Sequence, residues 1–225
     1  MGIAGFDFVV LDAEHGPLSL EQCEHLVRAA DCAAVVPLVR MHAAARAGIG
    51  QYLDIGALGV QVPMVNDAAG AQGAVAAAKY PERGQRGLGG CRAVALGSAG
   101  SLASYVADAN EQTLVVIQIE TTQAVDHLAD ILAVPDVDAV FIGPADLSTT
   151  MGHAGDFEVP RFKETVDEIR RATLAAGKAV GTVAPNPEAA RRLVDQGYTY
   201  LVGSVGGLIQ TTFKTYVAGI RASAQ

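Results

Sequence analysis

The chain has 225 residues, half of them hydrophobic, and a formal net charge of -8. This acidic balance argues against a nucleic-acid surface, which usually shows as a clustered basic patch. No apolar run approaches the roughly 20 residues that a membrane helix requires. The length fits one α/β barrel of about 200–250 residues. We therefore expect a single domain over residues 1–225 that binds neither nucleic acid nor membrane.

Short β-like runs alternate with alanine-rich helical segments along the chain. This alternation is typical of a parallel sheet built from βαβ units. The expected strands are 6–12, 35–40, 59–63, 114–119, 139–142, 179–183 and 200–202. The expected helices are 18–30, 43–55, 68–79, 122–132, 162–176 and 187–196, and several of them stop at glycine.

Seven strands are visible, whereas a closed barrel of this type has eight. The first five residues resemble the end of a helix that runs straight into a strand. We therefore expect a (β/α)8 TIM barrel that lacks its first β-strand and helix in this chain. The segment from Gly206 to Ala222 carries apolar residues at helical spacing and is predicted to be the final helix.

Cysteine usage bears on the cellular compartment. Cys23, Cys32 and Cys91 are odd in number and lack the spacing of metal ligands. The amino terminus has neither a basic flank nor the apolar core of a secretion signal. These features predict a protein of the reducing cytoplasm.

Five of the predicted strands end in a polar or charged cluster. The richest runs from Asp12 to Pro17, and the others lie at Arg40, at Pro63-Met64, at Gln118 to Glu120, and at Gly143 to Asp146. The carboxyl ends of parallel barrel strands open on one face, where barrel enzymes build their sites. The pattern therefore predicts an enzyme.

Glu120 and Asp146 follow two successive strands and could converge on a divalent ion through oxygen ligands. The alternative is that each carboxylate caps the helix or turn that follows it. Both interpretations are compatible with the spacing.

His15 follows Asp12 by three residues, and a carboxylate that orients an imidazole makes a plausible acid/base pair. A histidine after a strand can also be structural. Arg40 could bind a developing oxyanion or a carboxylate, or form a surface salt bridge. No lysine closes a strand on this face, so catalysis through a lysine Schiff base is the weaker alternative.

The loop from Arg83 to Gly90 combines arginines with glycines and could cradle an anion. It is neither a Walker loop nor a dinucleotide-binding fingerprint. A mobile lid or an oligomer contact explains it at least as well.

The sequence resembles a known family, the HpcH/HpaI-type class II pyruvate aldolases, which include 4-hydroxy-2-oxoheptanedioate and 2-dehydro-3-deoxyglucarate aldolases. The resemblance covers nearly the entire chain. It depends on a set of motifs: Gly5 to Phe8 leading to Leu11 to His15, Leu38 to Arg40, Leu53 to Gly56, Val62 to Val65, Tyr80 to Gly87, Gln118 to Thr121, and Phe141 to Ser148.

The resemblance assigns roles to residues of this sequence. Glu120 and Asp146 fall on positions that bind Mg²⁺, Mn²⁺ or Co²⁺, and His15 with Asp12 on the catalytic dyad. Arg40 matches the enolate-stabilising arginine. Asp54 matches an acidic position associated with the water network of the metal, and the role of Glu14 stays open. The substrate-binding positions that match are Arg40, Gln118, Gly143, Pro144, Ala145 and Asp146.

The resemblance also implies the reaction and the assembly. The reaction is cleavage or formation of a 4-hydroxy-2-oxo acid through a metal-bound pyruvate-type enolate, with a 2-oxo acid and an aldehyde as partners. Members of the family have an additional amino-terminal strand and helix, and they commonly exchange the last helix between subunits. A homo-oligomer, a trimer or a hexamer, is therefore expected.

Two alternatives stay open from the sequence. One is a lyase of the malyl-CoA or citramalyl-CoA type, which shares the barrel and the metal carboxylates. The other is a non-catalytic oligomeric relative that still binds a metal or a 2-oxo acid.

Overall fold

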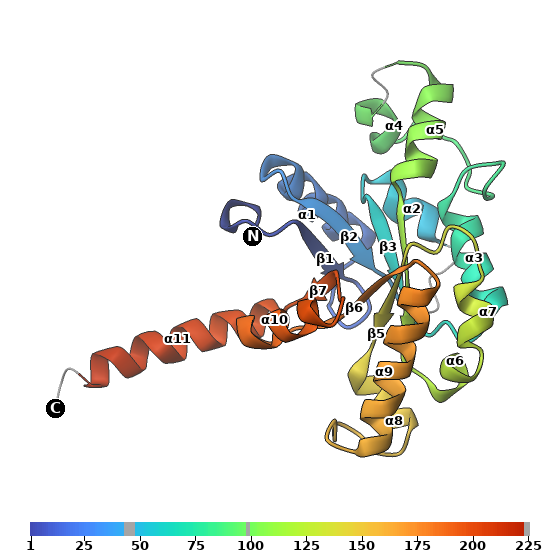
Figure 1. Cartoon of the computed structure of the whole chain (residues 1–225). Helices are drawn as coiled ribbons and strands as arrows, with labels where there is room; N and C mark the ends of the chain where they lie inside the picture. Colours follow the sequence, from blue (N-terminus) through green and yellow to red (C-terminus); the bar gives the residue numbers. More distant parts are fainter. Residues whose placement is uncertain (43–47, 98–99, 223–225) are drawn as a thin grey trace.

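The sheet consists of seven parallel strands whose spatial order follows their order in the chain (Figure 1). The computed structural model describes residues 1–42, 48–97 and 100–222. The strands are β1 (Phe8–Asp12), β2 (Val36–Arg40), β3 (Gly59–Val62), β4 (Leu114–Ile119), β5 (Ala139–Ile142), β6 (Ala179–Val183) and β7 (Tyr200–Val202). They form a nearly closed α/β barrel, so the predicted strands and barrel class are confirmed.

The helices are mostly those that the sequence predicts. In chain order they are the 3-10 helix η1 (Gly2–Ala4), α1 (Leu20–Cys32), α2 (Ile49–Asp54), α3 (Ala68–Ala78), α4 (Arg92–Gly97), α5 (Leu102–Gln112), α6 (Thr122–Asp126), α7 (Leu128–Leu132), α8 (Pro144–Thr150), α9 (Pro160–Ala175), α10 (Pro187–Asp195) and α11 (Val205–Ala222). Residues 43–47 of the predicted helix 43–55 lie outside the described residues.

Some boundaries differ from the prediction for local reasons. The predicted helix 122–132 divides into α6 and α7 at His127, whose backbone leaves the helical region at φ -105° and ψ 16°. β2 begins at Val36 because Ala34 adopts a left-handed φ of 49° and the Val35 N–H still bonds to the end of α1. Helices α4, α5 and α8 are not among the predicted ones.

Two apolar layers hold the fold together. Outside the sheet, buried side chains such as Val60, Ile117 and Ile142 pack against the surrounding helices. Inside the barrel a smaller cluster is built from Leu38, Val116, Ala139, Phe141 and Tyr200. Burial on both faces is what parallel barrel strands require, and it explains their nearly continuous apolar composition.

The two outer strands of the sheet approach each other through their aromatic rings. Phe8 of β1 stacks on Tyr200 of β7 with ring centroids 4.7 Å apart. Gly181 of β6 makes room for this arrangement, because a Cβ atom there would lie 2.5 Å from the Tyr200 ring. We call this contact between Phe8 and Tyr200 the seam.

Helix α11 projects away from the barrel (Figure 1). All of its side chains that the structure describes are exposed. Among the described residues, none of the helices combines the length and apolar character needed to cross a membrane. Cys23, Cys32 and Cys91 are all unpaired.

Candidate active site

A cavity of about 500 Å³ lies at the carboxyl ends of the strands. Most of the residues singled out from the sequence line it, together with apolar residues of β1, β5, β6 and β7. The predicted residues that line it are Asp12, His15, Arg40, Gln118, Glu120, Gly143, Pro144, Ala145 and Asp146. The topology therefore brings these residues together, as expected for a barrel.

Strand register pairs Asp12 with Arg40. The two residues are direct neighbours on β1 and β2. The Arg40 Nε donates to Asp12 Oδ1 at 3.0 Å and Nη2 donates to Oδ2 at 2.5 Å. Burial acts to raise the pKa of Asp12, but the bonds from Arg40 and from two backbone amides outweigh it and lower the pKa. Such a bidentate pair fixes the orientation of the guanidinium.

Asp12 also organises the loop after β1. Its Oδ1 accepts hydrogen bonds from the backbone N–H groups of Glu14 and His15, both at 3.1 Å. Asp12 therefore contacts the backbone of His15, whereas the imidazole faces the Glu14 carboxylate, with His15 Nε2 3.9 Å from Glu14 Oε2. The predicted catalytic roles of His15 and Asp12 stay predictions. The hydrogen bond between them involves the backbone N–H of His15.

Glu14 lies between the side chains of Arg40 and His15. Its Oε2 is 3.4 Å from Arg40 Nη1, and this oxygen is buried without a hydrogen-bond partner. Burial raises the pKa of Glu14, and the nearby carboxylates of Asp12 and Asp146 add to the rise against the opposing effects of Arg40 and His15.

Glu120 is 3% exposed and accepts two hydrogen bonds. Its Oε1 accepts from the Met64 N–H at 2.7 Å, and its Oε2 accepts from Gln118 Nε2 at 2.7 Å. Burial raises the pKa of Glu120, and the charges of Glu14 and Asp146 raise it further. The capping alternative for Glu120 is wrong, because Thr121 caps α6 through its bond to the Ala124 N–H.

A chain of side-chain hydrogen bonds connects Glu120 with the seam. Tyr200 donates to Gln61 Oε1 at 3.0 Å, Gln61 donates to Gln118, and Gln118 donates to Glu120. At the other oxygen, Met64 presents its N–H from a left-handed backbone with φ 54°. This conformation is uncommon outside glycine, and strained residues of this kind cluster at functional sites.

Asp146 lies in the first turn of α8, and Gly143 precedes the helix as its N-cap. The Asp146 side chain is exposed, and its charge contributes to the raised pKa values of both Glu14 and Glu120. Asp146 therefore forms an acidic cluster with Glu14 and Glu120, and it does not occupy the capping position.

The Glu120 carboxylate can occupy its position only because residue 143 is a glycine. A Cβ atom at Gly143 would lie 2.7 Å from Glu120 Oε2 and 2.9 Å from Glu120 Cβ. We expect Gly143→Ala to displace the carboxylate and to weaken divalent-metal binding at least about tenfold, measured by calorimetry. Gly73→Ala is the matched control, because a Cβ there meets no atom within 4 Å. Equal metal affinity in both variants would contradict this role of Gly143.

The acidic cluster fits a divalent metal in its chemistry. Glu120 and Asp146 supply hard oxygen donors, and the charge of Asp146 helps to raise the pKa of Glu120, an effect that a bound cation would oppose. No group of three or more histidine, cysteine, aspartate or glutamate residues arranged for a metal occurs in the described part of the chain. A site with two protein carboxylates suits Mg²⁺-like ions, which keep several waters or substrate oxygens as ligands.

Asp54 does not line this cavity. Its Oδ1 pairs with Arg86 Nη2 at 2.7 Å, and both residues border a separate depression beside α2 and α3. The structure thus separates Asp54 from the other predicted site residues, and its catalytic role stays a prediction. In the Gly/Arg-rich loop, Arg83 is likewise paired, with Glu111 and Asp136.

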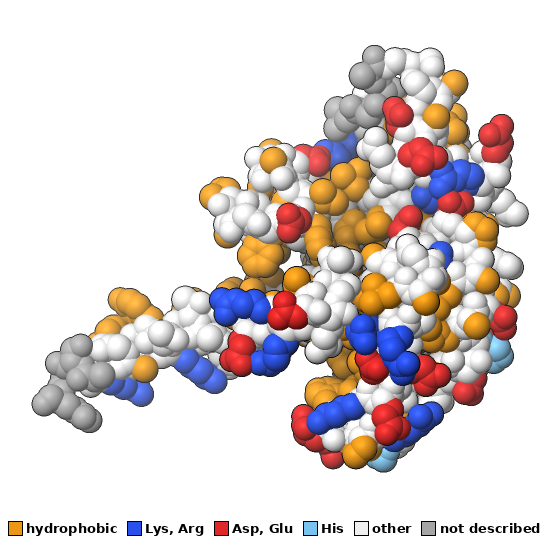
Figure 2. Space-filling model, viewed as in Figure 1, with side chains coloured by type: hydrophobic (Ala, Val, Ile, Leu, Met, Phe, Trp, Pro, Cys, Tyr) orange, Lys and Arg blue, Asp and Glu red, His pale blue; other side chains and the backbone are white. Residues whose placement is uncertain are grey.

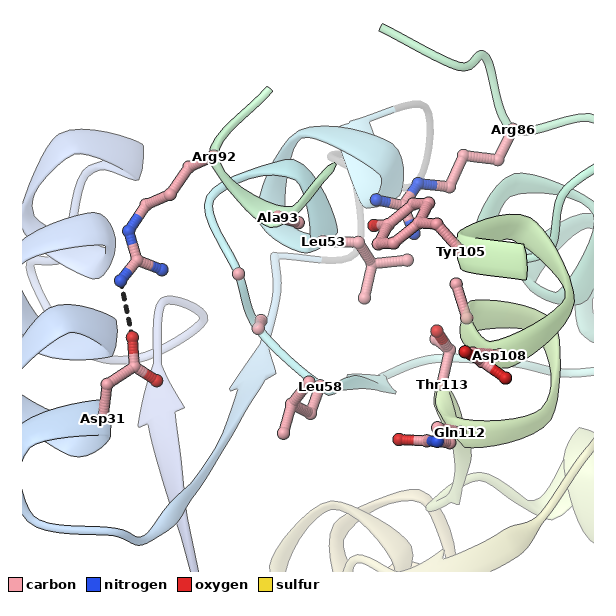
Figure 3. Close-up of a pocket in the computed structure, with 13 residues that line it drawn as sticks. Asp31, Leu53, Leu58, Arg86, Arg92, Ala93, Tyr105, Asp108, Gln112 and Thr113 are labelled. Carbon is pink, nitrogen blue, oxygen red and sulfur yellow. Dashed lines mark hydrogen bonds and ion pairs between the residues drawn. The ribbon is translucent and has the colours of Figure 1, made fainter. Parts of the chain in front are cut away.

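A second pocket of about 390 Å³ lies near the amino-terminal ends of β3 and β4, away from the acidic cluster (Figure 3). Its two arginines already have partners within the chain. Arg92 pairs with Asp31, as Figure 3 shows, and Arg86 pairs with Asp54. This pocket holds none of the predicted site residues.

Three contributors to the site had no role assigned from the sequence, although Met64 lies in one of the predicted strand-end clusters. Gln61 and Tyr200 belong to the hydrogen-bond chain, and Met64 contributes a backbone N–H. A signal for Gln61 exists, since it is a glutamine within the otherwise apolar run of β3 and is 2% exposed. Buried polar side chains of this kind require hydrogen-bond partners.

The fold and the cavity together define a (β/α)-barrel protein with an acidic cavity at the carboxyl ends of its strands. The HpcH/HpaI aldolase/citrate lyase family matches residues 1–209. The chain belongs to this family, and the resemblance seen in the sequence is confirmed.

Similar proteins include named aldolases. A hydroxypyruvate/pyruvate aldolase from Delftia acidovorans is 42% identical over 197 residues, which are 88% of this chain and 73% of that protein. A 2-keto-3-deoxy-L-rhamnonate aldolase from Klebsiella pneumoniae is 36% identical over 92% of this chain and 78% of its own length. The crystal structure of an HpcH/HpaI aldolase from Desulfitobacterium hafniense superimposes with a TM-score of 0.89 at 34% identity, covering 98% of this chain and 85% of that one.

Proposed function

We propose that the chain is a divalent-metal-dependent aldolase that cleaves or forms 4-hydroxy-2-oxo acids by way of a pyruvate-type enolate. Membership of the family and the named aldolase relatives support the lyase activity. The observation that carries the metal proposal is the convergence of Glu120 and Asp146 beside the paired Arg40 in one cavity.

In this proposal Glu120 and Asp146 would hold the ion, which we expect to be Mg²⁺, Mn²⁺ or Co²⁺. When bound, the ion would supply Lewis-acid stabilisation of the charge that develops on the 2-oxo group. The chain's own residues supply the remaining steps.

Arg40 would donate to the oxygen of the 2-oxo group as it becomes an enolate, since Asp12 already fixes the direction of its guanidinium. In cleavage, His15 would accept the proton of the 4-hydroxyl group while the bond between C3 and C4 breaks. The electron pair of that bond forms the enolate, and its protonation at C3 gives a pyruvate-type product and an aldehyde. Gln118 and the segment from Gly143 to Asp146 would contact the 2-oxo acid.

The test is pyruvate release by the purified chain from 4-hydroxy-2-oxo acids, measured after chelation and again with Mg²⁺, Mn²⁺ or Co²⁺ restored. We expect activity to disappear on chelation and to return with metal. Activity that survives complete chelation, or no activity with any of the three metals in a folded sample, would contradict the proposal.

A malyl-CoA or citramalyl-CoA type lyase is the neighbouring alternative, and the same assay with the CoA thioester separates the two. No observation on the described residues favours it. Cytoplasmic location is likewise a proposal, which the three unpaired cysteines support.

We further propose that the protein is a homo-oligomer, a trimer or a hexamer, in which α11 packs on another copy. The supporting observation is the exposure of apolar side chains along the projecting helix, where Figure 2 shows hydrophobic groups beside basic ones. These side chains are Val205, Leu208, Ile209, Phe213, Tyr216, Val217 and Ile220. An apolar surface of this kind on one element marks an interaction site.

We expect Phe213→Glu to dissociate the oligomer, because Phe213 is 65% exposed in the isolated chain and would be buried in the assembly. Sedimentation or light scattering measures the mass. Lys214→Glu on the same helix is the matched control and should leave the mass unchanged. A monomeric wild-type protein would overturn the assembly without touching the site chemistry.

A further inference from the structure

Gln118 uses only part of its hydrogen-bonding capacity within the chain. A primary amide has two N–H donors and one carbonyl acceptor. The Gln118 Nε2 donates to Glu120 Oε2 at 2.7 Å, and its Oε1 accepts from Gln61 Nε2. The structure records no other acceptor for Nε2 among the described residues, and Gln118 lines the cavity. Its second N–H is therefore left for a ligand in the cavity.

The orientation of this amide depends on its hydrogen bonds. The last torsion of a glutamine side chain is broad and roughly two-fold, so packing alone does not choose between the amide and its flipped form. Gln118 is 1% exposed, so its carbonyl needs a donor inside the protein. In the flipped form the carbonyl oxygen would face the Glu120 carboxylate, and two acceptors would oppose each other.

Gln61 supplies the donor and is itself held at its other end. Its side chain is 2% exposed, and its Oε1 accepts from the Tyr200 hydroxyl at 3.0 Å. Because Tyr200 engages the carbonyl of Gln61, the amide nitrogen of Gln61 faces Gln118. Tyr200 in turn is held at the seam, where its ring stacks on Phe8.

These polar groups reach into an apolar part of the barrel. Tyr200 belongs to the interior cluster, whose other buried members are Leu38, Val116, Ala139 and Phe141. Buried polar groups in such surroundings cost free energy unless they are bonded to each other. A network in which each member has its partner is rigid and allows one arrangement. The bonds from Tyr200 and Gln61 therefore hold Gln118 in one orientation.

We propose that Gln61, held by Tyr200, is a positioning residue that fixes the amide of Gln118 with its second N–H toward an oxygen of a bound 2-oxo acid. This role rests on the proposed function, because the 2-oxo acid is the ligand. Gln61 acts through Gln118 on binding, so its loss should change the affinity for the 2-oxo acid more than the chemical step.

Calorimetric titration with pyruvate at saturating Mn²⁺ measures this affinity without turnover. Gln61→Met keeps the length of the side chain and removes both of its polar groups. We expect it to weaken pyruvate binding about tenfold, which corresponds to about 1.4 kcal/mol. Tyr200→Phe removes only the anchor of Gln61 and should have a smaller effect in the same direction. Gln112→Met, at an exposed position outside the cavity, is the matched control. Unchanged affinity in Gln61→Met would overturn the proposal.

A double variant separates positioning from a general loss of stability. Gln61→Met alone leaves the buried Tyr200 hydroxyl without its acceptor, and adding Tyr200→Phe removes that hydroxyl. The double variant should therefore regain Tm relative to Gln61→Met and still bind pyruvate weakly, because the Gln118 carbonyl lacks its donor. Pyruvate affinity that recovers together with Tm would show that Gln61 is merely structural.

Steady-state kinetics separate this role from the aldolase activity. We expect Gln61→Met to raise KM for the 4-hydroxy-2-oxo acid about tenfold with little change in kcat. A chain that binds pyruvate with the help of Gln61 but releases none would refute the aldolase and leave the positioning role intact. An active chain with the same KM in Gln61→Met would do the reverse. A metal-loaded chain that neither binds nor releases pyruvate would overturn both.

Discussion

Glu120→Gln is expected to lower metal-dependent pyruvate release by a factor of about 10² to 10³, or to abolish it. The glutamine keeps the size of the side chain but removes the charge that a divalent ion requires. Lewis-acid stabilisation supplies several kcal/mol, and each 1.4 kcal/mol corresponds to a factor of ten in rate. Calorimetric titration with Mn²⁺ should show the loss of binding directly.

The same substitution should stabilise the metal-free chain at neutral pH. Burial raises the pKa of Glu120. At a pH above that raised value the carboxylate is charged, and its charge lowers the free energy of unfolding. The gain in the variant should be present at neutral pH and shrink as the pH falls through the raised pKa, because the wild-type carboxyl then also becomes neutral. Each kcal/mol should appear as about 2–4 °C in Tm.

The hydrogen-bond chain can accommodate glutamine at position 120. If the amides of Gln61 and Gln118 both turn over, every bond in the chain reverses its direction, and the Tyr200 hydroxyl accepts where it had donated. His15→Ala is the functional control, because it should reduce turnover and spare metal binding. Unchanged metal affinity in Glu120→Gln would remove Glu120 from the metal site.

Arg40→Ala is expected to reduce kcat/KM by about 10² to 10³, the usual cost of removing one donor to a developing oxyanion. Arg40→Lys should recover only part of the activity, since an ammonium keeps the charge but cannot form the two-nitrogen pair with Asp12. Steady-state kinetics with a 4-hydroxy-2-oxo acid measure both variants. Arg192→Ala, on the exposed face of α10, is the matched control.

Arg40→Ala should also change the pH dependence of stability. The lowered pKa of Asp12 means that its contribution to stability exists above its unfolded pKa and is lost as the pH falls through the folded value. Without Arg40 only the part due to the two backbone N–H groups is left, so the variant should be less stable at neutral pH and approach the wild type in acid. Wild-type kinetics together with reduced stability in Arg40→Ala would show that the arginine forms only a salt bridge.

The strands were predictable because their apolar runs are short and end in polar clusters, and all seven occur in the structure. α5 was harder to predict because its capping box uses Ser104, where a longer Glu or Gln would have marked the helix start. The division at His127 depends on local backbone geometry that the apolar spacing does not encode.

The site residues were predictable as a set, but their pairing was not. The polar strand ends of β1, β2, β4 and β5 indicate one cavity because the strands are parallel. Which carboxylate meets which cation depends on register and rotamer, as the bonds from Asp12 to Arg40 show. The position of Asp54 could not be predicted in this way. It lies at the end of α2, and strand register does not determine where a helix residue lies relative to the strand ends.

Tyr200 links the seam with the acidic cluster. Tyr200 stacks on Phe8 where the outer strands meet, and it also begins the hydrogen-bond chain that ends on Glu120. A ligand that immobilises Glu120 therefore also restrains Gln118, Gln61 and Tyr200, and through the stacked rings it holds β7 against β1. Because such coupling is reciprocal, closure of the barrel and occupancy of its site favour each other. Amide hydrogens near the seam should accordingly exchange more slowly when the site is filled, although neither Phe8 nor Tyr200 lines the cavity.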